Sequence, residues 1–206
     1  LSRSFQEDKG LVQINEKNES NIEWIQCDLF SLIDLENALD QVDFAIYLVH
    51  SMLPTSKLVQ AEFQDNDLII ADNFARTAKK KGVKQIIYLG GIIPKVKDLS
   101  LHLKSRLETE DTLRNYGIPV TSLRAGIIIG KNGSSFNILK KLVERLPVMI
   151  LPSWTQNASK PVAIEDVIKS VHFCLGNEDT FNKEYDLGGN TFMTYQELLE
   201  ETAKEL

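Results

Sequence analysis

Short runs of β-branched and aromatic residues alternate along this chain with longer amphipathic stretches. Three of four strand-like runs are apolar enough to be buried on both faces of a sheet. Strands that alternate with helices are typical of βαβ units, which build a mainly parallel sheet covered by helices on both faces. The pattern therefore predicts an α/β fold. The four predicted strands span residues 22–27, 44–49, 85–89 and 120–123.

The predicted helices carry recognisable signals at their ends. Ser31 with Asp34 resembles a capping box at one helix start, and Thr194 with Glu197 resembles another. Gly82 follows the end of the longest amphipathic stretch, where a glycine commonly ends a helix. These signals place the helix boundaries within a few residues. The predicted helices span residues 57–81, 101–116, 135–145, 164–175 and 195–206.

The length of 206 residues favours one domain that covers residues 1–206. Residues 146–163 contain three prolines and few periodic positions, which predicts a long excursion rather than a linker between domains. We expect a small substrate-side region around residues 131–163 and 177–206.

Composition excludes several classes of function. The net charge of -6 would repel a polyphosphate backbone, so we expect no nucleic-acid partner. The two cysteines form no CxxC motif, and the three histidines lack the carboxylate spacing of a metal site. No apolar run approaches the ~20 residues that span a bilayer, and no signal peptide is visible, so we expect a cytoplasmic protein without a membrane segment.

The residues just after each predicted strand are the candidates for ligand binding. In a doubly wound sheet the ligand lies outside the carboxyl ends of the strands, at one common edge. The segments at these four ends are Asp28-Leu29, His50-Ser51, Gly90-Gly91 and Ala125-Gly126.

These segments stand in an order that resembles the extended and atypical branch of the short-chain dehydrogenase/reductase superfamily, including its epimerase/dehydratase-like and NmrA-like members. Asp28-Leu29 is similar to the family's pair beside the adenine, and the passage from Gly82 to Gly91 is similar to its entry into the active site. Residues 123–130, 161–167 and 185–189 resemble the stretches beside the nicotinamide, near the substrate pocket and before the closing helix. The resemblance implies a Rossmann-like three-layer sandwich.

The same resemblance implies a nicotinamide dinucleotide as cofactor. The family's glycine-rich GxxGxxG loop does not occur in this sequence, which therefore resembles the family without its first strand, loop and helix. Arg3 would stand where a cation pairs with a 2′-phosphate, which favours NADP over NAD, although a simply exposed arginine is the alternative. The cofactor-binding candidates are Arg3, Asp28, Leu29, Leu48, His50, Ser51, Leu89, Gly90 and Gly126.

The family's catalytic Tyr-x-x-x-Lys pair is replaced by His102 and Arg106. Their i,i+4 spacing keeps an imidazole and a guanidinium on one helix face, and the nearby cation would favour the neutral imidazole, which can accept a proton. The alternative is that both residues only hold the ribose or line a surface groove. The family's catalytic serine is replaced by Gly90-Gly91, and His50 could either contact the ligand or form a structural hydrogen bond.

Two functions follow from these substitutions, and the sequence leaves both open. The first is an NAD(P)-dependent oxidoreductase or epimerase/dehydratase-like enzyme acting on a small molecule that the sequence does not identify. The second is a non-catalytic NAD(P)-binding redox sensor or scaffold of NmrA-like type. A partner-binding domain without a nucleotide is a third interpretation. Homo-oligomerisation is left open.

Overall fold

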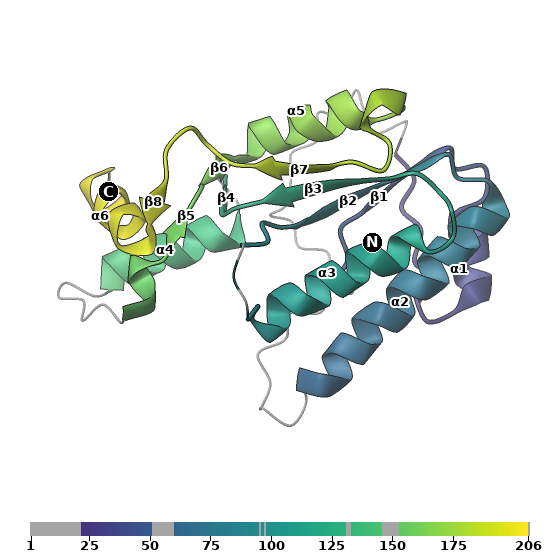
Figure 1. Cartoon of the computed structure of the whole chain (residues 1–206), viewed down its shortest axis with the longest axis horizontal. Helices are drawn as coiled ribbons and strands as arrows, with labels where there is room; N and C mark the ends of the chain where they lie inside the picture. The colour runs from purple at the N-terminus through teal and green to yellow at the C-terminus, as the bar shows by residue number, and fades with distance from the viewer. Residues whose placement is uncertain are drawn as a thin grey trace.

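The computed structural model describes residues 22–50, 60–94, 96, 98–130, 133–145 and 153–205 (Figure 1). Its centre is a parallel sheet with the strand order β1-β2-β3-β7. Helix α5 (Ile164–Cys174) lies on one face of this sheet, and α1, α2 and α3 lie on the other (Figure 1). The predicted α/β three-layer arrangement is confirmed. The strands are β1 (Phe44–Tyr47), β2 (Gln85–Gly91), β3 (Val120–Ala125) and β7 (Glu184–Leu187).

The main core lies between the sheet and the layer of three helices. Tyr47 of β1 and Tyr88 of β2 are fully buried there, and the edge of the Tyr47 ring meets Phe74 with the centroids 5.0 Å apart. Strand β2 is buried on both faces over its first four residues, as a central parallel strand should be. The helices of this layer are α1 (Leu32–Ala38), α2 (Gln60–Lys81) and α3 (Leu101–Arg114).

Local capping explains where the helices begin and end. The Ser31 hydroxyl accepts a hydrogen bond from the Asp34 amide at 3.3 Å, which confirms Ser31 as the cap of α1. The Asp34 carboxylate accepts from the Asp28 amide and not from Ser31, so the predicted capping box is only half formed. Gly82 adopts a φ of 77° directly after α2, a conformation that glycine reaches without steric cost. The amide of Thr194 donates to the Glu197 carboxylate at 2.7 Å, which confirms the second capping box.

The carboxyl ends of β3 and β7 lead into a smaller layer of short elements. Two two-stranded ladders, β4 with β6 and β5 with β8, connect the central sheet to a pair of packed helices (Figure 1). The core of this region contains Leu139, Leu198 and Leu199. Its elements are β4 (Ile128–Ile129), α4 (Ser134–Arg145), η2 (Ser153–Gln156), β5 (Ala158–Ser159), β6 (Val162–Ala163), η3 (Glu178–Thr180), β8 (Met193–Thr194) and α6 (Tyr195–Glu205).

The prediction of a strand over residues 22–27 is wrong. These residues join no ladder, and the described sheet ends at β1. A strand exists only when a neighbour accepts its backbone hydrogen bonds, and none of the described segments lies beside this one as such a partner. The predicted strand over 44–49 ends at Tyr47, and the first three residues of the predicted helix over 57–81 lie outside the described residues.

Candidate functional site

Strands β1 and β2 and helix α3 bring the predicted active-site residues to one edge of the sheet. His50 follows β1, and Gly90 lies at the carboxyl end of the neighbouring strand β2. Helix α3 begins on the same side, because the buried Tyr88 hydroxyl donates to the carbonyl oxygen of Arg106 at 3.2 Å. His102 lies one turn before Arg106 on this helix. The carboxyl edge therefore carries two imidazoles and a guanidinium.

The charge of Arg106 acts on both histidines. Partial desolvation, and then the Arg106 guanidinium, lowers the pKa of His102 below its ordinary value. The pKa of His50 is lowered by the same two causes in the same order, and His102 contributes a further small repulsion. Both side chains have exposed surface, and the same guanidinium acts on each of them. Near neutral pH both imidazoles are uncharged and can accept a proton.

Asp67 is a site residue that the sequence analysis missed. It is buried on α2, and its negative charge opposes the lowering of both histidine pKa values. Burial first, and then Asp67, raises the pKa of Tyr47. The signal was present in the sequence, since Asp67 stands three and seven residues before Ile70 and Phe74 on the apolar stripe of a predicted helix. A carboxylate on such a stripe is expected to be buried with partners.

Packing explains two of the predicted cofactor-binding glycines. A Cβ atom at Gly126 would overlap the carbonyl oxygen of Lys160, so no side chain fits there. A Cβ at Gly90 would lie 2.9 Å from the Tyr88 ring. Both glycines are therefore required by their own neighbours, and their contact with a cofactor stays a prediction.

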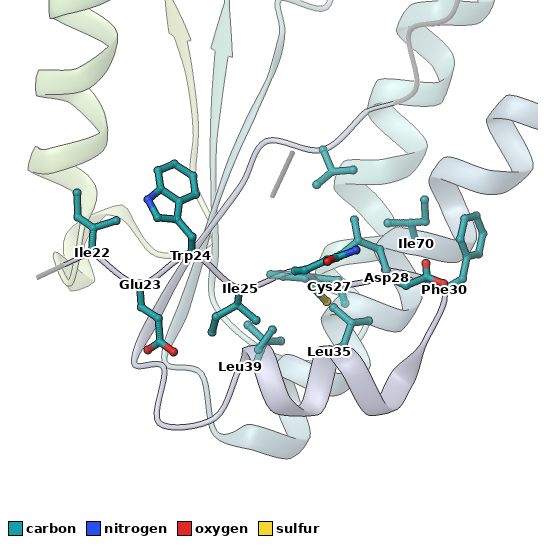
Figure 2. A pocket seen from close by; sticks show the side chains of 15 residues that line it. Ile22, Glu23, Trp24, Ile25, Cys27, Asp28, Phe30, Leu35, Leu39 and Ile70 are labelled. Atoms are coloured by element: carbon teal, nitrogen blue, oxygen red, sulfur yellow. The ribbon is translucent and has the colours of Figure 1, made fainter. Parts of the chain in front are cut away.

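Asp28 lies on the wall of an apolar cleft of about 610 Å³ (Figure 2). Its carboxylate accepts a hydrogen bond from the Phe30 amide at 3.0 Å, which fixes the turn before α1. Leu29 packs against the main core. Val49, the residue before His50, also lines the cleft.

The remaining predicted residues divide into three groups. Leu89 packs inside the sheet against two apolar clusters, whereas Leu48 is exposed beyond the end of β1. Arg3 and Ser51 lie outside the described residues. The cofactor roles of these four residues stay predictions.

A buried ion-pair network fixes α3, and with it His102, against the sheet. The Glu110 carboxylate, with its side chain 2% exposed, accepts two hydrogen bonds from Arg124 of β3, at 2.9 and 3.1 Å. Arg114 lies 3.0 Å from the same carboxylate and donates to Glu184 of β7 at 2.8 Å. A hydrogen bond from Arg114, and then the nearby charge of Arg124, lowers the pKa of Glu184 despite partial desolvation. The network links α3, β3 and β7.

Two further features concern the described residues alone. They contain no group of three His, Cys, Asp or Glu side chains placed to hold a metal ion. None of their helices combines the length and the apolar character that crossing a membrane requires.

The polar side chains of the candidate site fit parts of a nicotinamide dinucleotide. Neutral imidazoles and an exposed carboxylate can hydrogen-bond ribose hydroxyls, and a guanidinium can pair with an anionic group. His102 and Arg106 supply the imidazole and the guanidinium at the carboxyl edge, and Asp28 supplies the carboxylate at the cleft. A glycine-rich loop that would cradle a pyrophosphate does not occur in the sequence.

Comparison with known proteins gives one curated relative and several solved structures. The chain is 32% identical over 128 residues to the auxiliary protein GraX of Staphylococcus aureus, an alignment that covers 58% of this chain and 38% of that protein. The dTDP-glucose 4,6-dehydratase DesIV of Streptomyces venezuelae, solved with NAD, matches with a TM-score of 0.76 and 14% identity over 91% of this chain and 65% of that one. No family model matches the chain.

Two epimerases superpose similarly. The UDP-N-acetylglucosamine 4-epimerase of Bacillus cereus has a TM-score of 0.68 and 20% identity over 87% of this chain and 68% of its own. The UDP-glucose 4-epimerase of Thermus thermophilus, in complex with NAD, has a TM-score of 0.70 and 18% identity over 92% of this chain and 71% of its own. The chain thus spans 65% of the dehydratase and 38% of GraX. It has the Rossmann-like fold of the NAD-dependent epimerases and dehydratases, the extended branch of the short-chain dehydrogenase/reductases, as its sequence resemblance predicted.

Proposed function

We propose that this protein is an NAD(P)-dependent oxidoreductase of the epimerase/dehydratase-like kind, with its site at the carboxyl edge of the sheet. The observation that carries this proposal is that His50 follows β1, while the Tyr88–Arg106 hydrogen bond holds helix α3, which carries His102, against β2. These groups lie where a doubly wound sheet binds its ligand. Solved proteins with this fold include a dehydratase and an epimerase that bind NAD.

Each residue has a distinct part in the proposal. Asp28 hydrogen-bonds a hydroxyl of the adenosine ribose, and His50 contacts the cofactor near Gly90. The nicotinamide supplies hydride transfer when bound. His102, kept neutral by Arg106, accepts the proton that a hydroxyl of the substrate loses when the adjacent carbon becomes a carbonyl. Arg106 keeps its fixed charge throughout and holds the imidazole in the basic form.

The finer features of the function are parts of the same proposal. Arg3 favours NADP over NAD, because a guanidinium pairs with a 2′-phosphate. The substrate is a small molecule that binds near Gly90, His102 and Asp166. We place the protein in the cytoplasm.

A second function, a non-catalytic NAD(P)-binding sensor or scaffold, is favoured by a specific observation. Gly90 and Gly91 stand where the enzymes of this fold place a hydroxyl, and no phenol takes the position of His102. Tyr88 is buried, and its hydroxyl donates to a backbone carbonyl instead of pointing to the site. Such a site would bind the dinucleotide and report its redox state without turnover.

Binding and turnover by the full natural protein separate these proposals. We expect NADP⁺ to bind and to oxidise one of a panel of small hydroxyl compounds, and we expect His102→Ala to lower kcat by about 10² to 10⁴ while Kd for NADP⁺ changes little. The control is His172→Ala, which alters an exposed histidine on α5. Binding without turnover would favour the sensor, and turnover that survives in His102→Ala would contradict the assigned role. Absence of binding would contradict both functions.

A further inference from the structure

Strand β7 forms one edge of the central sheet, and within the described residues it pairs with β3 alone. The carbonyl oxygens of Lys183 and Leu187 accept hydrogen bonds from amides of β3 and of the residue after it. Because backbone direction alternates along a strand, Glu184 and Asp186 direct their N–H and C=O groups away from β3. Unpaired strand edges are templates for pairing with another strand. The outer side of β7 therefore offers backbone donors and acceptors to an extended segment.

A groove of about 400 Å³ lies beside this edge, between β7 and α5. The buried residues Leu123 and Cys174 line it and make its inner part apolar. Phe173 of α5 and Tyr185 of β7 line it as well, with exposed fractions of 69% and 36%. In Figure 1 helix α5 runs along β7 on this face of the sheet. The groove therefore suits apolar side chains that come from a segment beside β7.

The opposite face of β7 is acidic. Glu184 and Asp186 alternate with Tyr185 and therefore lie on the face of the sheet that carries α3. Glu184 is held by Arg114 at 2.8 Å and by Arg124 at 2.9 Å. Asp186 is exposed, and no ion pair among the described residues includes it. A cation on a neighbouring strand would be complementary to this carboxylate.

We propose that the outer edge of β7 docks an extended peptide of a partner protein in which apolar and basic residues alternate. The peptide backbone pairs with Glu184 and Asp186, its apolar side chains enter the groove beside Phe173, and a basic side chain faces Asp186. A strand that adds to a sheet edge gains affinity from main-chain hydrogen bonds and specificity from pockets for alternate side chains. The alternation follows because residues opposite one another in a ladder lie on the same face.

A second copy of this chain is a poorer occupant of the same edge. If two copies of β7 paired antiparallel, residues on the same face would stand opposite one another. With Tyr185 opposite its own equivalent, Glu184 and Asp186 of the two copies face each other. The registers on either side of this one place Glu184 or Asp186 opposite its own equivalent. Like charges directly opposite destabilise a sheet, whereas a basic partner strand meets attraction at these positions.

The probe is a synthetic, fluorescently labelled peptide of about eight residues in which lysine alternates with phenylalanine or valine. Fluorescence anisotropy gives its Kd for the chain of 206 residues. One control peptide has the same composition with all lysines in one half, and a second has glutamate in place of lysine. We expect each control to bind about tenfold more weakly or less. No nucleotide is present in the assay, so its result is independent of the proposed oxidoreductase function.

Matched variants locate the binding surface. Phe173→Ala should weaken binding about tenfold or more, because the groove loses its most exposed ring. Asp186→Asn should weaken it about two- to fivefold, the range of an exposed charge pair. Ile33→Ala on α1 and Asp65→Asn on α2 should leave binding unchanged, because they remove an exposed apolar side chain and an exposed carboxylate from the other layer of helices (Figure 1). Circular dichroism of each variant checks that its fold is retained.

Amide hydrogen exchange tests the backbone pairing. The bound peptide should slow exchange at the amides of Glu184 and Asp186 and leave the amides of β1 unchanged, because β1 lies at the far edge of the sheet. The proposal is overturned if the peptide does not bind at millimolar concentration, if a control peptide binds equally well, or if Phe173→Ala binds as tightly as the unaltered chain. Slowed exchange at β1 instead of β7 would also overturn it. A dimer in sedimentation that Phe173→Ala dissociates would assign the edge to a second copy of the chain.

Discussion

Glu110 is a buried carboxylate shared by two arginines, and we predict that its removal destabilises the fold more than any exposed charge change. In Glu110→Ala the Arg124 guanidinium loses the carboxylate that accepts two of its hydrogen bonds, and its side chain is only 15% exposed. Breaking a buried pair by removing one member typically costs about 3 to 5 kcal/mol. Glu184 still contacts both Arg114 and Arg124, so we expect the lower end, about 3 kcal/mol.

Urea unfolding followed by circular dichroism measures this free energy. The matched control is Glu184→Ala, which removes a partly exposed carboxylate from the same network and should cost about 1 kcal/mol or less. A double-mutant cycle of Glu110→Ala with Arg124→Ala should give a coupling energy of about 1 to 3 kcal/mol. The reasoning is refuted if Glu110→Ala costs no more than Glu184→Ala, since the carboxylate would then not be buried and paired as described.

The remaining predictions concern the site and its support. In Arg106→Gln the pKa of His102 should rise, because the lowering charge is gone; NMR titration of the ring protons measures it, and an unchanged pKa would contradict the proximity of the two groups. Folding lowers the pKa of His50 and His102, so the unfolded state binds more protons than the folded state below a pH of about 6.5. The free energy of unfolding should therefore fall as the pH drops from about 6.5. It should fall less in a variant that carries both His50→Gln and His102→Gln. Gly126→Ala should cost about 1 to 3 kcal/mol in urea unfolding, because its Cβ overlaps a backbone oxygen; a neutral change would show that this segment relaxes freely. Gln85→Leu should cost about 1 to 3 kcal/mol in the same assay, since the Gly176 amide loses its acceptor; equal stability would mean that another group replaces it.

Features that depend on a few neighbouring residues could be predicted from the sequence. The caps at Ser31 and Thr194 need only a hydroxyl and a carboxyl-bearing residue three positions later. The full box forms at Thr194, and the hydroxyl half of the box forms at Ser31. Gly82 ends α2 as predicted, because the positive φ there is a local requirement. The placing of His50 and Gly90 at one edge was also predictable, since the neighbouring parallel strands β1 and β2 end side by side there.

Features that depend on distant residues were not predictable in the same way. The pairing of Glu110 with Arg124 joins a helix to a strand through side chains that no local pattern relates. Gly126 was assigned to a cofactor, yet its lack of a side chain is already required by the Lys160 backbone, thirty-four positions later in the sequence. Sequence spacing can show that a glycine is needed, but the neighbour that requires it is defined only by the fold.

The failed strand prediction over residues 22–27 follows from the same distinction. Alternating apolar residues give a segment the side-chain pattern of a strand, and Figure 2 shows Trp24 and Ile25 on opposite sides. The pattern is a property of one segment, whereas a strand is a property of two, because its backbone groups must be paired. On the described chain the neighbouring edge of β1 is also unpaired. Because no ladder among the described residues protects the amides of residues 22–27, whereas β2 is paired on both sides, we expect these amides to exchange hydrogen faster than those of β2.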